Sequence, residues 1–257
     1  MLVRIIGGHG GLAPGFRNTS YLIDGKLLID AGSVASGLRI EEQTQIDHIL
    51  ISHSHLDHIS DLAFLCDNCF GMRPASFDVY SSPTVRQSIL THLMNDIIWP
   101  DFTRIPSRKN PTMQFHDLKN EQVLELGVYK IMPVKVNHPG EAMGFIVERT
   151  DKDVAVLFTQ DTGPTNRIWE VAKDYKNLKA IFTEVSFPNA LAQVASDSCH
   201  HTAKTMQAEI LKMPKNIPIF LGHLKPNYQA QLFQEISSLN NERITVLSSD
   251  DTSYVFT

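Results

Sequence analysis

The chain has 257 residues, of which 42% are hydrophobic and 20% are charged, a balance typical of a globular protein and not of a fibrous or disordered one. Folding at this length buries about three quarters of the surface of the unfolded chain, so neither disulfide bonds nor a structural metal is needed for stability. The 23 basic and 28 acidic residues leave a formal charge of -5, which disfavours a protein that binds nucleic acid by spreading cations over phosphates.

Twelve short β-rich segments bounded by Gly, Asp or Ser are predicted to be strands. In chain order they are 3–6, 21–23, 27–29, 48–51, 79–81, 128–136, 144–148, 154–158, 180–184, 217–221, 244–247 and 253–256. Helical spacing of apolar residues predicts helices over about 59–69, 84–96, 165–176, 202–212 and 228–239. Interleaved strands and helices indicate an α/β or α+β class. Because the first strands follow one another without helices, we expect two mixed sheets packed face to face with helices outside.

One irregular stretch, residues 99–120, contains three prolines and is locally basic at positions 104, 108 and 109. It is predicted to be a long surface loop, and both a functional loop and a plain insertion are compatible with it. The sequence shows no internal repeat, low-complexity tract or linker, so one domain is expected over residues 1–257.

The longest apolar runs, such as residues 217–221, have the length of a strand and fall far short of the ~20 residues of a membrane helix. The start of the chain lacks the charged head, apolar middle and cleavage site of an export signal, which predicts a cytoplasmic protein. Three cysteines suit a reducing compartment. Cys66 and Cys69 form a C-x-x-C pair without a second pair, and we expect two buried side chains on one helical face, not zinc ligands.

The segment Ile49-Leu-Ile-Ser-His53-Ser-His55-Leu-Asp57-His58 places a buried strand directly before four metal-capable side chains. In an extended segment, residues i and i+2 point to the same side, so His53 and His55 can present two imidazoles to one ion. Asp57 and His58 follow at an expected helix start and can face a second ion. Imidazole and carboxylate suit zinc, with manganese or iron as alternatives.

Three further metal-capable residues, His138, Asp161 and His223, each follow an apolar strand directly. Loops at strand ends are where a rigid scaffold carries catalytic groups. Taken singly, each of these residues is compatible with an ordinary turn residue. Together with the first motif, they complete a pair of metal sites.

In this order, His53-x-His55-x-Asp57-His58, His138, Asp161 and His223 resemble the metallo-β-lactamase superfamily, and the resemblance covers nearly the whole chain. It implies a four-layer αββα sandwich and two divalent metal ions that share an activated water. One ion would be held by His53, His55 and His138, the other by Asp57, His58 and His223, with Asp161 bridging. Oxygen-reducing di-iron members typically have a glutamate where this chain has His55, so the hydrolytic pattern is the better match.

Further segments are similar to the class II cyclic-nucleotide phosphodiesterases, whose site plan ribonuclease Z shares. These segments are residues 18–21, 27–33, 53–60, 182–189, 200–202 and 222–226. The resemblance implies that His200 contacts the scissile phosphate and protonates the leaving oxygen, with Glu184 and Thr202 holding it, and that Asp57 belongs to the catalytic set. The alternative is that residues 199–201 form a solvated loop with Thr202 as a helix N-cap. Asp30 could orient a ligand histidine or be a turn residue.

Two positions depart from these family patterns. His9 lies in a glycine-rich turn where small residues are usual, and we expect a surface residue there, with substrate contact as the alternative. Thr183 stands where ribonuclease Z has a histidine, which weakens the prediction of a transfer-RNA enzyme.

The expected function is hydrolysis of 3',5'-cyclic nucleotides (cyclic AMP or cyclic GMP) to 5'-nucleotides at a dinuclear metal centre, with a small-molecule substrate. The alternatives are an RNA 3'-processing endonuclease, another hydrolase of this fold, or a catalytically silent metal-binding or nucleotide-sensing module. A homodimer is compatible with the sequence, which specifies neither the oligomeric state, the native metal nor the base preference.

Overall fold

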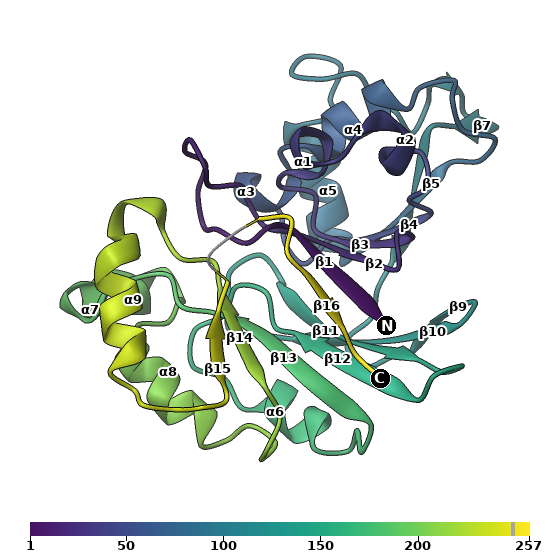
Figure 1. Ribbon diagram of the computed structural model, residues 1–257. Helices are drawn as coiled ribbons and strands as arrows, with labels where there is room; N and C mark the ends of the chain where they lie inside the picture. Colours follow the sequence, from purple (N-terminus) through teal and green to yellow (C-terminus); the bar gives the residue numbers. More distant parts are fainter. Residues whose placement is uncertain (248–249) are drawn as a thin grey trace.

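The computed structural model describes residues 1–247 and 250–257 and consists of two large mixed sheets that lie face to face (Figure 1). The first sheet has the order β16 (Ser253–Val255), β1 (Leu2–Gly7), β2 (Ser20–Ile23), β3 (Leu27–Ile29), β4 (His48–Leu50), β5 (Phe77–Ser81) and β8 (Met113–Asp117). Its strands pair antiparallel from β16 to β3 and parallel from β3 to β8.

The second sheet has the same mixed character in the order β15 (Ile244–Val246), β14 (Ile219–Gly222), β13 (Leu178–Glu184), β12 (Val154–Phe158), β11 (Met143–Arg149), β10 (Tyr129–Lys135) and β9 (Leu124–Leu126). Strands β15 to β12 are parallel, and β12 to β9 are antiparallel. A small separate hairpin joins β6 (Pro106–Ser107) to β7 (Asn110–Pro111).

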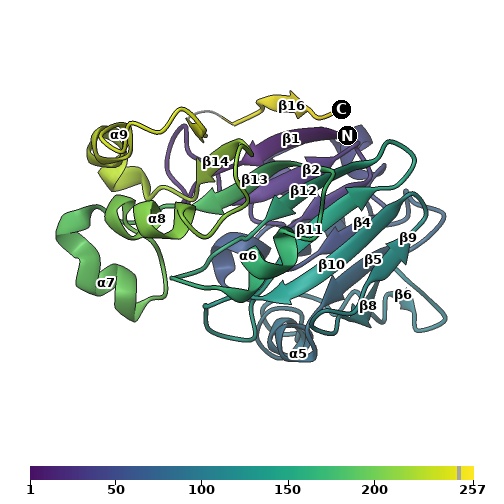
Figure 2. The same ribbon diagram turned by 90° about the horizontal axis from the view of Figure 1, so that it is seen from below.

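Helices lie on the outer side of each sheet (Figures 1 and 2). The first sheet carries α1 (Val34–Gly37), α2 (Ile40–Gln43), α3 (Leu56–Ile59), α4 (Leu62–Asn68) and α5 (Pro83–His92). The second carries α6 (Arg167–Ala172), α7 (Ala192–Asp197), α8 (Ala203–Ile210) and α9 (Gln229–Ser237), with 3-10 turns at η1 (Asn189–Leu191) and η2 (Pro226–Tyr228). The predicted four-layer αββα sandwich is confirmed.

Three apolar layers hold these elements together. The layer between the sheets contains a stack of Phe158, Phe182 and Phe220, whose neighbouring ring centroids are 5.0 and 4.6 Å apart. A second layer fills the space between the first sheet and its helices, and a third lies under α6, α8 and α9. Alternate residues of a strand face opposite sides, so a sheet covered on both faces needs the near-continuous apolar runs seen in β12 and β13.

Each of the twelve predicted strands is present, with ends within two residues of the prediction. The five predicted helices are present too, although the first is divided into α3 and α4 and the second ends at His92. Helices α1, α2 and α7 and strands β6 to β9 were not predicted, because each is too short or too polar to show a clear period.

The prediction of a long surface loop over residues 99–120 is wrong for its second half. Strand β8 pairs in parallel with β5, and Phe102 and Met113 are buried in the layer outside the first sheet. β8 has only one neighbour in the sheet, and its residues at 114, 116 and 117 are exposed. An edge strand of this kind lacks the apolar run of a central strand, so the prolines around it dominate the pattern.

Cys66 and Cys69 are buried at the end of α4, as expected, and the Cys66 thiol lies 3.9 Å from the sulfur of Met113. Burial raises the pKa of Cys69 to about 11 and raises that of Cys66 further. Both groups are therefore protonated thiols packed in the core.

Among the helices of residues 1–247 and 250–257, none combines the length and the apolar character that a membrane span requires.

We expect Phe182→Ala to lower the free energy of unfolding of the metal-free protein by about 3–5 kcal/mol, because a fully buried ring leaves a cavity in the layer between the sheets. Leu211→Ala is the control, since Leu211 is 86% exposed and the change should cost less than about 0.5 kcal/mol. Urea unfolding of both variants measures the difference. Equal losses would contradict this account of the core.

Candidate metal centre

The metal-capable side chains gather at one end of the sandwich, where strands of both sheets end. Segment 53–58 follows β4 of the first sheet, while His138, Asp161 and His223 follow β10, β12 and β14 of the second sheet. β10, β12 and β14 run in the same direction, because two antiparallel pairings separate β10 from β12 and β12, β13 and β14 are parallel. The ends of these three strands therefore lie on one edge of the sheet.

The first cluster consists of His53, His55, His138 and Asp161, each with one candidate ligand atom within 4.8 Å of the others. His55 Nδ1 lies 3.2 Å from His138 Nε2. Asp161 Oδ2 lies 3.6 Å from His53 Nε2 and 4.0 Å from His138 Nε2. The structure thus brings together the first predicted ligand set and the carboxylate that is expected to bridge.

The second cluster consists of Asp57, His58 and His223. The predicted helix start is confirmed as the single turn α3, which carries Asp57 and His58. His223 Nε2 lies 3.7 Å from Asp57 Oδ2. Asp161 reaches this cluster as well, with Oδ2 at 3.2 Å from His58 Nε2 and Oδ1 at 3.2 Å from His223 Nδ1.

Three buried nitrogens in these clusters lack hydrogen-bond partners. They are the Nε2 atoms of His53, His58 and His223. Buried polar atoms of folded proteins almost always have a partner, and imidazole nitrogens beside a carboxylate are a typical donor set for zinc and related divalent ions. The residues present therefore fit a metal centre.

Electrostatics favours cation binding at these groups. Burial lowers the pKa of His53 well below its ordinary value and lowers that of His223 to about 4, which leaves both imidazoles neutral with a free lone pair. Burial opposes the charge of Asp161, but His223 and His58 outweigh it and hold the pKa of the carboxyl well below the ordinary range. The site thus contains a buried carboxylate together with the neutral imidazoles of His53 and His223.

His58 differs, because burial alone would lower its pKa whereas Asp161 and Asp30 raise it well above the ordinary value. In the metal-free protein His58 holds a second proton between two carboxylates. A cation that binds Nε2 must displace that proton, so metal binding at this position is linked to proton release.

Asp30 is the hub that orients the histidines of the first sheet. His58 Nδ1 donates to Asp30 Oδ2 at 2.6 Å, and Ser52 Oγ donates to the same oxygen at 2.7 Å. Ser52 Oγ also lies 2.9 Å from His53 Nδ1, so the hydroxyl links the His53 ring to Asp30 and helps to fix its orientation. Gln160, from the other sheet, also donates to Asp30. Of the two alternatives for Asp30, the structure supports the orienting role.

The histidines of the second sheet are tied through Nδ1 as well. His138 Nδ1 donates to the backbone oxygen of Cys199 at 3.1 Å, and His223 Nδ1 lies 3.0 Å from Thr19 Oγ1. The backbone of Gln160 and of His223 is left-handed, with φ of 53° and 58°. For such residues this conformation costs about 1–2 kcal/mol each, so the fold stores strain at the site.

His200 and Glu184 form a buried pair beside the two clusters. His200 Nδ1 donates to Glu184 Oε1 at 2.7 Å, and Ser186 Oγ donates to Glu184 Oε2 at 2.7 Å. The His200 ring centroid lies 5.0 Å from that of His138 and 5.5 Å from that of His223. Burial opposes protonation, but Glu184 raises the pKa of His200 above its ordinary value.

Thr202 does not contact His200 in the hydrogen bonds of the described residues. It is the N-cap of α8, where its Oγ1 accepts from Thr205 N at 3.3 Å. The capping alternative therefore describes Thr202. Ser186, whose Oγ lies 3.2 Å from His200 Nδ1, is the hydroxyl beside His200 instead. The neighbouring His200 and His201 are both buried, so the alternative of a solvated loop is wrong.

The expectation of a surface position for His9 is wrong. Its side chain is 1% exposed, with Nδ1 3.4 Å from Asp250 Oδ1 and the ring packed edge-on against Phe16 at 4.9 Å. The glycine turn folds back against β14, where His223 N donates to the backbone oxygen of Gly8 at 2.7 Å. A small-residue turn therefore indicates close packing here and not exposure.

Sequence analysis missed Thr19, Ser52, Gln160 and Ser186, which hold the site together. Three of them lie within two residues of a predicted site residue, namely Ser52 beside His53, Gln160 beside Asp161, and Ser186 near Glu184. Proximity in the chain was the available signal, but small polar residues near strand ends are too common to single out.

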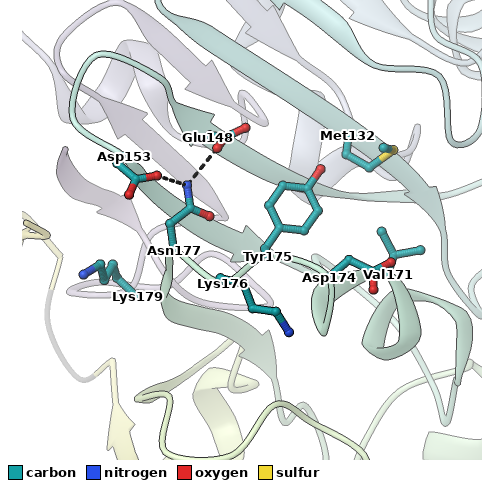
Figure 3. A pocket seen from close by; sticks show the side chains of 9 residues that line it. All are labelled: Met132, Glu148, Asp153, Val171, Asp174, Tyr175, Lys176, Asn177 and Lys179. Atoms are coloured by element: carbon teal, nitrogen blue, oxygen red, sulfur yellow. Dashed lines mark hydrogen bonds between the residues drawn. The ribbon is translucent and has the colours of Figure 1, made fainter.

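A hollow of about 660 Å³ lies away from these clusters, between β10, β11 and the segment after α6. Its lining includes Glu148, Asp153, Tyr175 and Asn177 (Figure 3). Asp153 precedes β12, whereas Asp161 follows it. The hollow is therefore at the opposite end of this strand from the metal-capable cluster, and no histidine lines it.

Comparison with known proteins agrees with the fold and the motifs. Residues 26–233 match the family described as the beta-lactamase superfamily domain. The chain is 24% identical over 275 residues to a protein of Yersinia pestis named probable 3',5'-cyclic-nucleotide phosphodiesterase, with 87% of this chain and 78% of that protein covered. It is 29% identical over 113 residues to ribonuclease BN of Salmonella typhimurium, a match that spans 44% of this chain and 34% of that protein.

Among solved structures, unliganded yeast PDE1 superposes with a TM-score of 0.83 at 16% identity, covering 100% of this chain and 99% of that one. At this identity the likeness bears on the fold alone. Together with the family match, it shows that this chain belongs to the beta-lactamase superfamily and has the metallo-β-lactamase fold.

Proposed function

We propose that this protein is a phosphodiesterase that depends on divalent metal ions and hydrolyses 3',5'-cyclic nucleotides to 5'-nucleotides. The observation that carries the proposal is the pair His200–Glu184 packed directly against two metal-capable clusters that share Asp161. A centre that binds an anionic phosphate next to an acid that can protonate the leaving oxygen is suited to phosphodiester hydrolysis.

We propose that His53, His55 and His138 hold one ion, that Asp57, His58 and His223 hold the other, and that Asp161 bridges them. Two divalent ions, when bound, supply Lewis acidity that neutralises phosphate charge and activates water. Zinc suits this mixture of imidazole and carboxylate, and manganese or iron are compatible with it.

His200 has the geometry of a proton donor. Its Nδ1 is occupied by Glu184, so Nε2 is the nitrogen available to the reacting phosphate. When the bond from phosphorus to the 3'-oxygen breaks, that alkoxide is a poor leaving group and takes the proton from His200, while water supplies the oxygen that enters at phosphorus. Glu184 stabilises the imidazolium and fixes its ring, with Ser186 satisfying the other carboxylate oxygen.

The choice of a cyclic nucleotide is supported by the name of the Yersinia pestis relative, which matches along 87% of this chain. An RNA 3'-processing endonuclease is the second candidate and is favoured by the shorter match to ribonuclease BN. Electrostatics supports it less. The net charge is -5, and in the basic segment after Trp99 the guanidinium of Arg104 is paired with Asp96 and Asp101.

The two candidates differ in their products. Metal-loaded protein offered cyclic AMP, cyclic GMP and a transfer-RNA precursor side by side should release 5'-AMP or 5'-GMP and leave the RNA intact. Chromatography of the products checks this. Cleavage of the RNA at its 3' side without turnover of either cyclic nucleotide would favour the endonuclease.

Asp161→Ala should lower the bound metal from two ions per chain to one or none, because both clusters lose the shared carboxylate. Activity should fall at least about a hundredfold, since even the loss of an outer-shell partner costs 10–100-fold. Elemental analysis of the purified variant measures the metal, and Asp153→Ala, at the far end of β12, is the matched control. Two ions retained in Asp161→Ala would refute the bridging assignment.

His200→Ala should keep two metal ions and lose activity in proportion to the need of the leaving group for a proton. The expected loss is about 10²–10⁴-fold for cyclic AMP and small for bis(p-nitrophenyl) phosphate, whose phenolate leaves without protonation. Comparing kcat for the two substrates tests this. Equal losses for both would argue against proton donation by His200.

A further inference from the structure

Beside the second cluster, which consists of Asp57, His58 and His223, lies an open groove of about 470 Å³. This groove has no role in the proposed mechanism. It is lined by Gly10, Gly11, Leu12, Ala13, Phe16, Lys225, Pro226 and Asn227. One wall is the turn between β1 and β2, the purple loop that leaves β1 on the side of α9 in Figures 1 and 2, and the other is the segment after β14. Its volume lies within the usual range of small-molecule sites.

Gly10, which lines the groove, packs against the candidate ligand His223. A Cβ atom on Gly10 would lie 2.6 Å from Cδ2 and 2.8 Å from Nε2 of that imidazole, so the backbone of the groove lies directly against the ring. Lys225 stands at the same end, with Nζ 4.0 Å from Asp57 Oδ2. Gly10 and Lys225 therefore border both the groove and the candidate metal centre.

Most of the apolar lining lies on the turn at residues 12–16, which is held by backbone hydrogen bonds. Leu12 is 74% exposed and shares the lining of the groove with Ala13 and Phe16. Ala13 and Phe16 exchange backbone hydrogen bonds of 3.2 and 2.9 Å across a tight turn, in which Gly15 has φ of 82°. The Phe16 ring rests edge-on against the buried His9, so the motif that sequence analysis left without a role supports this floor.

Lys225, at one end of the groove, lies near the proposed proton donor His200, with the Phe187 ring adjacent to both. Lys225 Nζ lies 5.9 Å from the centre of the Phe187 ring, and the Phe187 ring lies 5.7 Å from that of His200. The ammonium is therefore placed between the metal-capable cluster and the groove, where it can meet the negative charge of a phosphate.

We infer that this groove is the subsite for the nucleobase of the substrate, with Leu12 and Phe16 contacting the face of the base and Lys225 meeting the phosphate end. The inference rests on the proposed function for the phosphate site. A planar heteroaromatic base fits an apolar floor, and the amide of Asn227, which also lines the groove, can both donate to and accept from a base edge.

The test compares ligands that differ only in the base. In zinc-loaded protein, 5'-AMP should bind about 5- to 100-fold more tightly than ribose 5-phosphate, as expected for a base on an apolar platform. Leu12→Ala and Phe16→Ala should each reduce that advantage at least threefold. Leu211→Ala, which changes another exposed leucine at the end of α8, should leave it unchanged. Isothermal titration calorimetry measures both affinities.

Equal affinity of the parent protein for the two ligands, or an advantage unchanged in Leu12→Ala, would overturn the inference. Leu12→Ala decides the matter even if Phe16→Ala disturbs the turn. Lys225→Met should weaken both ligands by a similar factor, and a loss confined to 5'-AMP would overturn the placement of Lys225 at the phosphate.

Kinetics separates this inference from the proposed function. Leu12→Ala should raise KM for cyclic AMP at least threefold while kcat/KM for methyl p-nitrophenyl phosphate, which carries no base, stays at the parent value. If the parent protein hydrolyses neither substrate, the phosphodiesterase proposal fails, and the calorimetric comparison still decides whether the groove binds a base.

Discussion

The buried carboxylate of Asp161 is the constraint on which the rest of the site depends. It is 2% exposed and lies between the two sheets, where an isolated negative charge would cost several kcal/mol. Four histidines face it, and the Nε2 atoms of His53 and His58 have no neighbouring acceptor other than this carboxylate. Protons on His58 balance part of the charge in the metal-free protein, and divalent cations would balance it more fully. The buried negative charge destabilises the metal-free fold, and the same charge favours the binding of cations at this position.

The orientation of each histidine comes from a different part of the chain. His58 is held by Asp30 after β3, His138 by the backbone of Cys199 before α8, and His223 by the hydroxyl of Thr19 before β2. His58 and His138 are held through Nδ1 and direct Nε2 toward Asp161, whereas His223 directs Nδ1 toward Asp161 and Nε2 toward Asp57. The geometry therefore depends on both sheets being in place. The contact of Gln160 with Asp30 joins the two halves directly beneath the cluster. The site can therefore assemble only when the two sheets of the sandwich are packed together.

The sequence predicts the parts of this protein that depend on short-range patterns. Apolar runs of strand length mark the central strands, and the spacing of His53, His55, Asp57 and His58 reveals the cluster because the local backbone alone sets it. The edge strand β8 is not predicted, because most of its residues are exposed and it lacks an apolar run. The buried state of His9 depends on contacts between distant segments, which no pattern within one segment records. The hydrogen-bonding role of Ser186 and Gln160 was hidden for the same reason. The cap made by Thr202 is local, and the sequence offered it as one of two alternatives.

A protein of net charge -5 would bind the proposed anionic substrate through local positive charge, and Lys225 and His200 supply such charge beside the candidate metal centre. Lys225 lies near Asp57, and His200 is held by Glu184, so in the metal-free protein each cation faces a carboxylate. Bound divalent ions would take over the carboxylates of Asp57 and Asp161 and leave Lys225 and His200 with an excess of positive charge toward the substrate. Metal binding would thus create both the proposed catalytic centre and the field that attracts a phosphate to it. On this argument, the overall negative charge that disfavours RNA would favour the small cyclic phosphodiester of the proposed function.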